Sequence, residues 1–115
     1  MRPSELARIT GVSTRVLRHY EKKGLISSER SDNGYRDYSA KEIERVKWIV
    51  SLIRCGFSTR QISELDKFSQ VSDSNDDRFI QCLAQHKEKL RALDTFIALL
   101  NERRNALAER IQSFE

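Results

Sequence analysis

The chain has 115 residues, 33% of them charged and 38% hydrophobic, which suffices for one compact head and one additional long helix. Residues 1–60 hold 13 Lys and Arg against 7 Asp and Glu, a net charge of +6, whereas residues 61–115 hold 8 against 10, a net charge of −2. No apolar run approaches the roughly 20 residues of a membrane span and no signal peptide is recognisable, so we expect a cytoplasmic protein with no membrane partner. The charge asymmetry favours a head that binds a polyanion and a tail that binds protein.

The two cysteines, Cys55 and Cys82, have no CxxC or His-rich company and are expected to be free thiols. Two cysteines cannot supply the four ligands that zinc prefers, so no metal site is predicted. Cys55 follows Arg54, a cation that can make a thiol reactive, and is therefore a candidate sensor; an inert cysteine at a helix end is the commoner case. The chain shows no Ser/His/Asp set, paired carboxylates or phosphate-binding glycine loop, which predicts neither an enzyme nor a cofactor.

The first two expected helices, residues 4–9 and 14–23, are joined by a Thr-Gly turn. Ser13 is placed to cap the second helix and Gly24 to end it. Helical spacing predicts these buried side chains: Leu6, Ala7, Ile9, Val16, Leu17 and Tyr20. The opposite face of the second helix carries cations and a histidine: Arg15, Arg18, His19 and Lys22. This pattern is typical of a DNA-binding helix-turn-helix, and the recognition helix presents its cations to phosphates.

Residues 26–38 are expected to form a β-hairpin, with Asp32-Asn33-Gly34 at its tip. The interpretation is a two-residue turn whose residues adopt positive φ angles. Arg30 and Arg36 flank this turn, so the hairpin would form a basic wing beside the helix-turn-helix.

Two further helices are predicted from capping boxes, Ser39 with Glu42 and Ser58 with Gln61. The first would end at Gly56 and bury Ile43, Val46, Val50 and Ile53, and the second would bury Ile62, Leu65 and Phe68. Arg60, close to a helix N-terminus, is a candidate phosphate contact. The polar residues 69–76 are interpreted as a linker, which divides the chain into a head (1–68), a linker (69–76) and a final helix (77–115).

The final helix keeps a seven-residue repeat with alternating steps of four and three. The positions of this seam are Phe79, Leu83, His86, Leu90, Leu93, Ile97, Leu100, Arg104, Leu107, Ile111 and Phe114. Because the head is too small to cover so long a helix, we expect a coiled-coil homodimer held by Leu83, Leu90, Leu93, Ile97, Leu100, Leu107 and Ile111. His86 and Arg104 would disfavour other registers. A helix folded back over its own head is the alternative.

In order along the chain, these motifs resemble the MerR family of bacterial transcription regulators. The resemblance covers residues 1–65 closely and the long helix in architecture only. It is carried by Glu5-Leu6-Ala7, Thr10-Gly11-Val12-Ser13, Leu17-Arg18, Tyr20-Glu21, Lys23-Gly24-Leu25, Gly34-Tyr35-Arg36, Tyr38-Ser39 and Gly56-Phe57-Ser58 with Ile62. It implies a mostly α fold: a winged helix-turn-helix head with a small β-hairpin wing, followed by a long C-terminal coiled-coil dimerisation helix, antiparallel to its partner.

The resemblance also implies a site and a mechanism. Thr14, Arg15, Arg18 and Tyr20 match recognition-helix contacts, Tyr35 and Arg36 match wing contacts, and Tyr38 supports the wing. With the cations read from the helix and wing, the expected DNA-binding set is Thr14, Arg15, Arg18, His19, Tyr20, Lys22, Asn33, Tyr35, Arg36, Tyr38 and Arg60. Family members bend and untwist an overlong promoter spacer, so that RNA polymerase meets both core elements.

We therefore predict a homodimeric, sequence-specific regulator of transcription that binds double-stranded promoter DNA. Two other functions fit the same pattern. A DNA-architectural or recombination accessory protein would use the winged head without polymerase. A protein–protein adaptor would use the coiled coil, and its basic head would be incidental.

Overall fold

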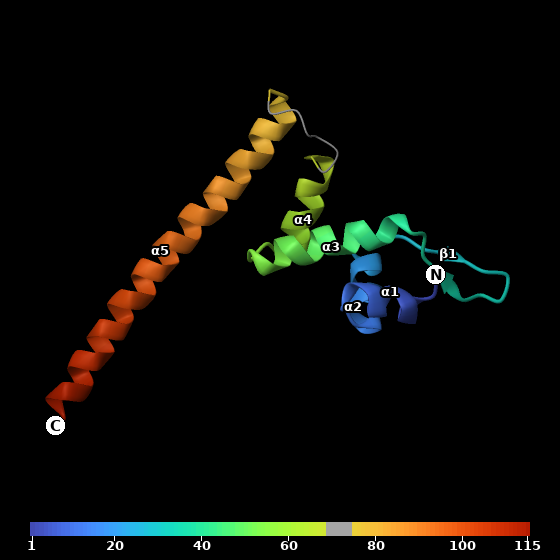
Figure 1. The fold of residues 1–115 in the computed structure, drawn as a ribbon. Coiled ribbons are helices and arrows are strands. Elements are labelled where there is room, and N and C mark those ends of the chain that lie inside the picture. The colour runs from blue at the N-terminus through green and yellow to red at the C-terminus, as the bar shows by residue number, and fades with distance from the viewer. Residues whose placement is uncertain (69–74) are drawn as a thin grey trace. The chain divides into compact units, whose positions relative to one another are not determined.

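The computed structural model describes residues 1–68 and 75–115, which belong to two compact units, Met1–Ser69 and Gln70–Glu115 (Figure 1). The first unit contains α1 (Pro3–Thr10), α2 (Thr14–Lys22), the strands β1 (Glu29–Arg30) and β2 (Arg36–Asp37), α3 (Lys41–Arg54), α4 (Thr59–Leu65) and the 3-10 turn η1 (Asp66–Phe68). The second unit contains α5 (Asp77–Ser113). The predicted class, mostly helical with a two-stranded hairpin and a long last helix, is confirmed.

The core of the first unit lies where α1 packs against α2 and α3, and where α3 packs against α4. Its buried apolar side chains are Leu6, Leu17, Tyr20, Leu25, Ile26, Tyr38, Val46, Ile49, Leu52, Phe57, Ile62, Leu65 and Phe68. Both α1 and α2 contribute only one narrow stripe to this core. Ile9 and Val16, expected to be buried, are exposed because they lie at the margin of that stripe.

The turn between α1 and α2 forms as the sequence predicts. Gly11 has a φ of 75° and its N–H donates to the carbonyl of Ala7 at 2.8 Å, which ends α1. The Ser13 hydroxyl then accepts from the N–H of Val16 at 3.2 Å and caps α2. Together these contacts fix the angle at which α2 leaves α1.

The wing has a longer loop than predicted. β1 and β2 are antiparallel, with Arg30 opposite Arg36, so five residues connect them. The N–H of Gly34 donates to Ser31 O, and the N–H of Ser31 donates to Tyr35 O, both at 2.8 Å. Gly34 has a φ of 78°, whereas Asn33 is not left-handed, since a loop of this length needs only one such residue.

Helix α3 begins and packs differently from the prediction. Its N-cap is Ala40 with no side-chain cap, because the Glu42 side chain turns into the protein instead of back to Ser39. The buried positions are Glu42, Val46, Ile49 and Leu52, so Val46 is confirmed. Val50 and Ile53 are exposed and Ile43 is half-buried, because the packed stripe is rotated around the helix from the predicted one.

Helix α4 begins with the predicted capping box. The Ser58 hydroxyl accepts from Gln61 N at 3.1 Å, and the Gln61 side chain accepts from Ser58 N at 2.9 Å. Ile62, Leu65 and Phe68 are buried, as expected.

Replacing the capping residue tests how much this box contributes. Ser58→Ala leaves the Gln61 N–H without its acceptor and is expected to lower the free energy of unfolding by about 1 kcal/mol. Urea unfolding measures the effect, and Ser63→Ala, at an exposed position within α4, is the control with little change expected. An equal loss in both variants would contradict the role of the box.

Helix α5 begins at Asp77, where Asp76 acts as N-cap and accepts from Arg78 N at 2.8 Å. Its 37 residues extend about 56 Å at 1.5 Å per residue. Most of the predicted linker, residues 69–74, lies outside the described residues. Among the residues that the structure describes, no helix is both long and apolar enough to cross a membrane.

Candidate nucleic-acid interface

The outer face of α2 carries a group of exposed cations. Arg15, Arg18, His19 and Lys22 are exposed, whereas Leu17 and Tyr20 on the inner face are buried. Thr14, at the start of the helix, is half-buried. Tyr20 was expected among the DNA contacts, but its side chain is 5% exposed and belongs to the core, where burial raises the pKa of its hydroxyl.

A network centred on Glu21 joins α2 to the wing. Arg36 Nε donates to Glu21 Oε2 at 2.8 Å, the Tyr38 hydroxyl donates to the same oxygen at 3.3 Å, and the Ser28 hydroxyl donates to Glu21 Oε1. Burial alone would raise the pKa of Glu21, but these three donors and the Arg36 charge hold it below its ordinary value. The wing is therefore fixed to the recognition helix by a carboxylate that is charged at neutral pH.

Two of the predicted DNA contacts, Tyr38 and Arg36, belong to this network. Tyr38 is 1% exposed and supports the wing from inside, where burial and then the neighbouring Glu21 raise the pKa of its hydroxyl. The Arg36 side chain is 30% exposed and its Nε is held by Glu21, so Arg36 fixes the wing, and its contact with DNA stays a prediction. Sequence reasoning missed Glu21 because its partners lie 7–17 residues away and share no local pattern with it.

The loop of the wing presents an exposed aromatic side chain beside a cation. Tyr35 is 59% exposed, and the Arg2 guanidinium lies 4.4 Å from the centre of its ring. Arg30 Nη1 donates to Gly34 O at 2.9 Å, which braces the loop, and Asn33 is exposed beside it. Arg2 was not predicted, because only the fold brings it to the wing.

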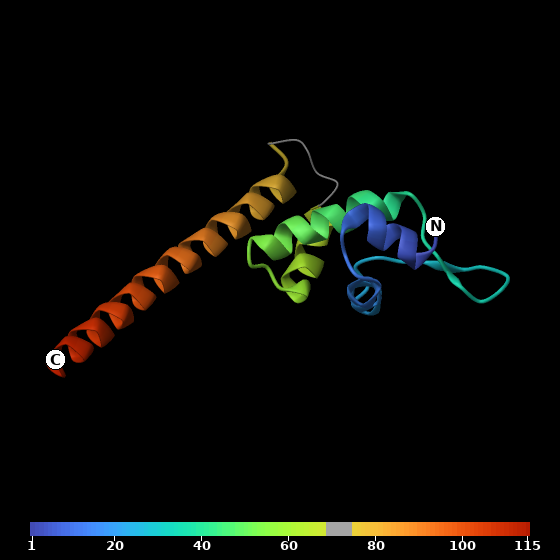
Figure 2. The ribbon, with the colours of Figure 1, turned by 60° about the horizontal axis from the view of Figure 1, so that its bottom comes forward.

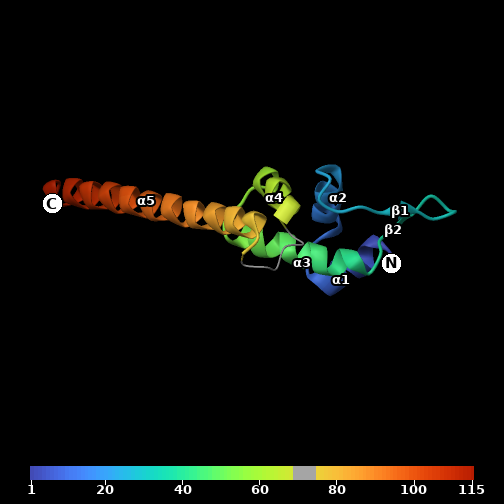
Figure 3. The same ribbon diagram turned by 90° about the horizontal axis from the view of Figure 1, so that it is seen from above.

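Figures 2 and 3 show α4, α2 and the wing in succession along α3, with α2 in the middle. Arg60 is exposed near the start of α4, and its contact with phosphate stays a prediction. The recognition helix and the wing are thus neighbours, as expected for a wing beside the helix-turn-helix.

Arg45 holds the interior of this arrangement. Its Nη2 pairs with Asp66 Oδ2 at 2.6 Å and its Nε donates to Leu25 O at 2.5 Å, so α3 is joined both to η1 and to the turn after α2. The hydrogen bond with Asp66 raises the pKa of Arg45 above its ordinary value, although the partial burial of Arg45 acts in the opposite direction. Arg45 is thus a structural residue that orients α2 and α4.

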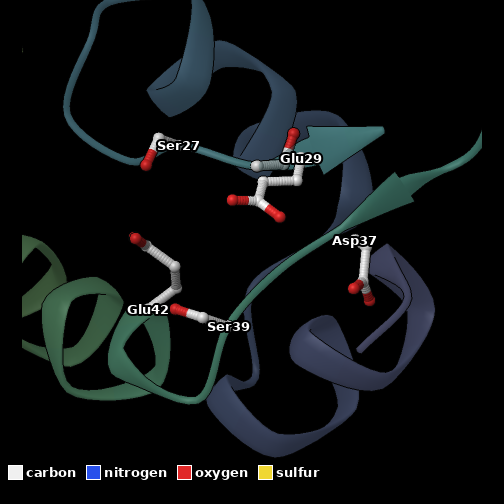
Figure 4. Close-up of a pocket in the computed structure, with 6 residues that line it drawn as sticks. Ser27, Glu29, Asp37, Ser39 and Glu42 are labelled. Atoms are coloured by element: carbon white, nitrogen blue, oxygen red, sulfur yellow. The ribbon is translucent and has the colours of Figure 1, made fainter. Parts of the chain in front are cut away.

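At the base of the wing lies an acidic hollow of about 190 Å³, lined by Ser27, Ser28, Glu29, Asp37, Ser39 and Glu42. Figure 4 shows Glu29 and Glu42 approaching it from opposite sides. Burial raises the pKa of Glu42, whose Oε2 is enclosed without a hydrogen-bond partner. Its negative charge makes this hollow unsuitable for phosphate. Within residues 1–68 and 75–115, no three His, Cys, Asp or Glu side chains are grouped to hold a metal ion.

The two cysteines are far apart in the sequence and differ in surroundings. Cys55 is exposed at the end of α3, and its role as a sensor stays a prediction. Cys82 is half-buried on α5 beside His86, and burial raises the pKa of its thiol.

Residues 1–68 match the family of MerR HTH regulatory proteins, and this match spans the whole head with its wing. The chain belongs to the MerR family. The resemblance read from the sequence is therefore confirmed, and the match includes α2, the wing and α4, the elements of the candidate interface.

MerR relatives of known sequence extend the match into α5. The chain is 32% identical over 112 residues to the transcriptional regulator HmrR of Rhizobium leguminosarum bv. viciae, covering 93% of this chain and 81% of that protein. It is 37% identical over 103 residues to nodulation protein NolA of Bradyrhizobium elkanii, covering 89% of this chain but only 44% of NolA. The chain thus spans less than half the length of NolA, one of the curated relatives that it matches.

A solved MerR structure shares the fold. HiNmlR, a MerR family regulator lacking the sensor domain and bound to promoter DNA, superimposes with a TM-score of 0.60 at 20% identity, covering 89% of this chain and 85% of HiNmlR. At that identity the likeness concerns the architecture, a winged head followed by a long helix.

Proposed function

We propose that this MerR-family chain is a regulator of transcription that binds double-stranded promoter DNA as a homodimer. The observation that carries the proposal is the cationic outer face of α2, beside a wing that Glu21 holds in place. HiNmlR, which has the same architecture, is bound to promoter DNA, which supports the choice of ligand.

On DNA, α2 would enter the major groove while the wing follows the backbone. Arg18 lies at the centre of the cationic face, where a guanidinium can donate two hydrogen bonds to guanine or to a phosphate. Arg15, Lys22 and Arg60 would hold phosphates on either side, and Tyr35 would pack on the sugar-phosphate chain. Thr14, His19 and Asn33 would add further polar contacts. The remaining members of the predicted set, Tyr20, Arg36 and Tyr38, would hold α2 and the wing in position.

The homodimer is proposed because the apolar seam residues of α5 are exposed to solvent in the single chain. Leu83, Leu90, Leu93, Ile97, Leu100, Leu107 and Ile111 are 40–59% exposed. A second copy in antiparallel orientation would bury this seam. It would also hold two heads at a set distance along one duplex.

Two rigidly connected heads would bend and untwist the DNA between them. Such a deformation makes specificity depend on base pairs that the protein never touches. In a promoter with an overlong spacer, it would bring the two core elements into register for RNA polymerase.

Replacing Arg18 tests the proposed interface. Arg18→Ala is expected to weaken binding to the operator by roughly 1–3 kcal/mol, about five- to 150-fold, because a direct contact is lost. Arg8→Ala is the matched control: Arg8 is also exposed and cationic but lies on α1, so only a small, nonspecific loss is expected. Titrations at one fixed salt concentration measure both, and equal losses would contradict the assignment of α2 as the reading helix.

Genomic selection tests the function itself. Purified protein is incubated with fragmented genomic DNA, and the bound fragments are mapped against promoters. Fragments centred on promoter spacers support the regulator, recombination attachment sites would instead indicate the accessory protein, and no preference would contradict specific binding.

A further inference from the structure

The seam of α5 is interrupted twice, at His86 and Arg104, and these two positions restrict how a second copy can pair with it. The inference rests on the homodimer proposed above. In a dimer with two-fold symmetry every contact occurs twice: if residue i of one copy meets residue j of its partner, then residue j of the first copy meets residue i of the partner. Each choice of register therefore places both interruptions at once.

We propose that two α5 helices pair antiparallel about Thr95, so that His86 of each copy meets the partner's Arg104. All other layers that join two seam residues are then apolar, and Phe114 alone has no seam residue opposite it. They join Phe79 with Ile111, Leu83 with Leu107, Leu90 with Leu100, and Leu93 with Ile97, each layer occurring twice.

Neighbouring registers lose this match. A shift by one heptad in one direction places His86 against Ile97 and Arg104 against Phe79. The opposite shift places His86 against Ile111 and Arg104 against Leu93. Each brings a guanidinium against hydrocarbon, a placement that is costly when the charge has no partner. A parallel pair would place two Arg104 side chains against each other.

The two polar side chains are chemically complementary. His86 Nδ1 lies 2.8 Å from the carbonyl oxygen of Cys82. Because a carbonyl only accepts, Nδ1 is the ring nitrogen that carries the proton, and in neutral histidine the acceptor is then Nε2. A guanidinium only donates, so Arg104 supplies the group that Nε2 can accept from.

A second observation comes from apolar residues beside the seam. Phe96 is 54% exposed and Ile80 is 52% exposed, and neither belongs to the heptad seam. In the proposed register Phe96 meets the partner's Phe96 at the two-fold axis, and Ile80 meets the partner's Ala108. A one-heptad shift would place Phe96 beside Lys89 or Arg103 instead.

The same register brings two kinds of like-charge contact to the rim. Lys89 lies near the partner's Arg103, and Asp94 lies near the partner's Asp94. Contacts of this kind in water cost little, whereas the alternative registers desolvate a charge inside the seam.

Charge exchange tests the polar layer. His86→Lys places an ammonium against the partner's Arg104 and is expected to raise the dimer Kd by about tenfold or more. Adding Arg104→Glu is expected to restore most of the affinity. Since positions 86 and 104 are about 27 Å apart within one helix, rescue must act between chains. His86→Lys with Arg91→Glu has the same charge and is the control without rescue; equal affinities of the two double variants in sedimentation equilibrium would overturn the register.

Distances between spin labels test the register directly. In a Cys55→Ser, Cys82→Ser background, one cysteine is introduced per variant at the exposed positions Glu88, Thr95 or Glu102 and labelled. The proposed register offsets the two labels along the axis by about 21 Å at both 88 and 102, and by about zero at 95. A one-heptad shift gives about 10 Å at one outer position and about 31 Å at the other. A parallel pair gives three equal distances.

The outcomes separate the two proposals. Equal distances at 88 and 102, both longer than at 95, support the register. A dimer with unequal outer distances, or with three equal ones, overturns the register and leaves the homodimer standing. A monomer at all concentrations overturns the homodimer.

Discussion

Leu93→Asp combined with Leu100→Asp is expected to convert the dimer into monomers. Each leucine contributes about 1.5–3 kcal/mol when fully buried, and a dimer contains four such sites, so roughly 6–12 kcal/mol of apolar burial is lost. A micromolar dimer is held by about 8 kcal/mol in all. The four carboxylates would also lie inside the seam, where an unpaired charge is strongly unfavourable. Light scattering over a concentration series measures the mass.

The control adds the same charge outside the seam. Gln81→Asp with Thr95→Asp places two aspartates at exposed positions on the opposite face of α5, and this variant is expected to stay dimeric. A dimer that persists in the seam variant would show that α5 is covered in some other way. Loss of the dimer in both variants would point to helix destabilisation by aspartate rather than to the seam.

Features encoded by neighbouring residues could be predicted from the sequence. The caps at Ser13 and Ser58 each involve residues three apart, and both form as expected. The repeat of α5 likewise follows from spacing along one helix. Such features need no knowledge of how the chain folds back on itself.

Features that depend on packing between distant segments could not be predicted in the same way. Val50 and Ile53 fit a helical apolar stripe as well as Ile49 and Leu52 do, and only contacts with the rest of the head decide between the two stripes. Glu42 fits a capping box, yet it turns inward. A periodic pattern thus shows that a helix has an apolar side but not the precise direction of that side.

The candidate site divides in the same way. The exposed cations of α2 follow from its helical period, so Arg15, Arg18, His19 and Lys22 could be predicted as a group. The placement of the wing could not, because it depends on Glu21, which accepts from three residues in two other parts of the chain, Ser28 before β1 and Arg36 and Tyr38 at β2. Because Glu21 is negatively charged, an argument that selects cations as DNA contacts also leaves it out.

Glu21→Ala is expected to weaken operator binding by about tenfold or more, a loss of about 1.4 kcal/mol. It is also expected to lower the free energy of unfolding by about 1–3 kcal/mol, because Arg36, Tyr38 and Ser28 lose their shared acceptor. Charge alone predicts the opposite effect on binding, since removing an anion near phosphates favours DNA. The sign of the change therefore decides between anchoring and simple electrostatics.

Glu29→Ala is the matched control. Glu29 is exposed on β1, and its replacement removes the same charge from the wing itself. It is expected to leave operator binding unchanged or slightly tighter; similar weakening in both variants would contradict the anchoring role.

Glu21→Gln adds a pH test. The folded-state pKa of Glu21 lies below its ordinary value of 4.5, so its contribution to stability is complete above about pH 4.5 and is lost as pH falls through the folded-state pKa. Glutamine cannot titrate, and the stability difference between the parent chain and Glu21→Gln, measured by urea unfolding, should therefore shrink as the solution becomes more acidic than pH 4.5.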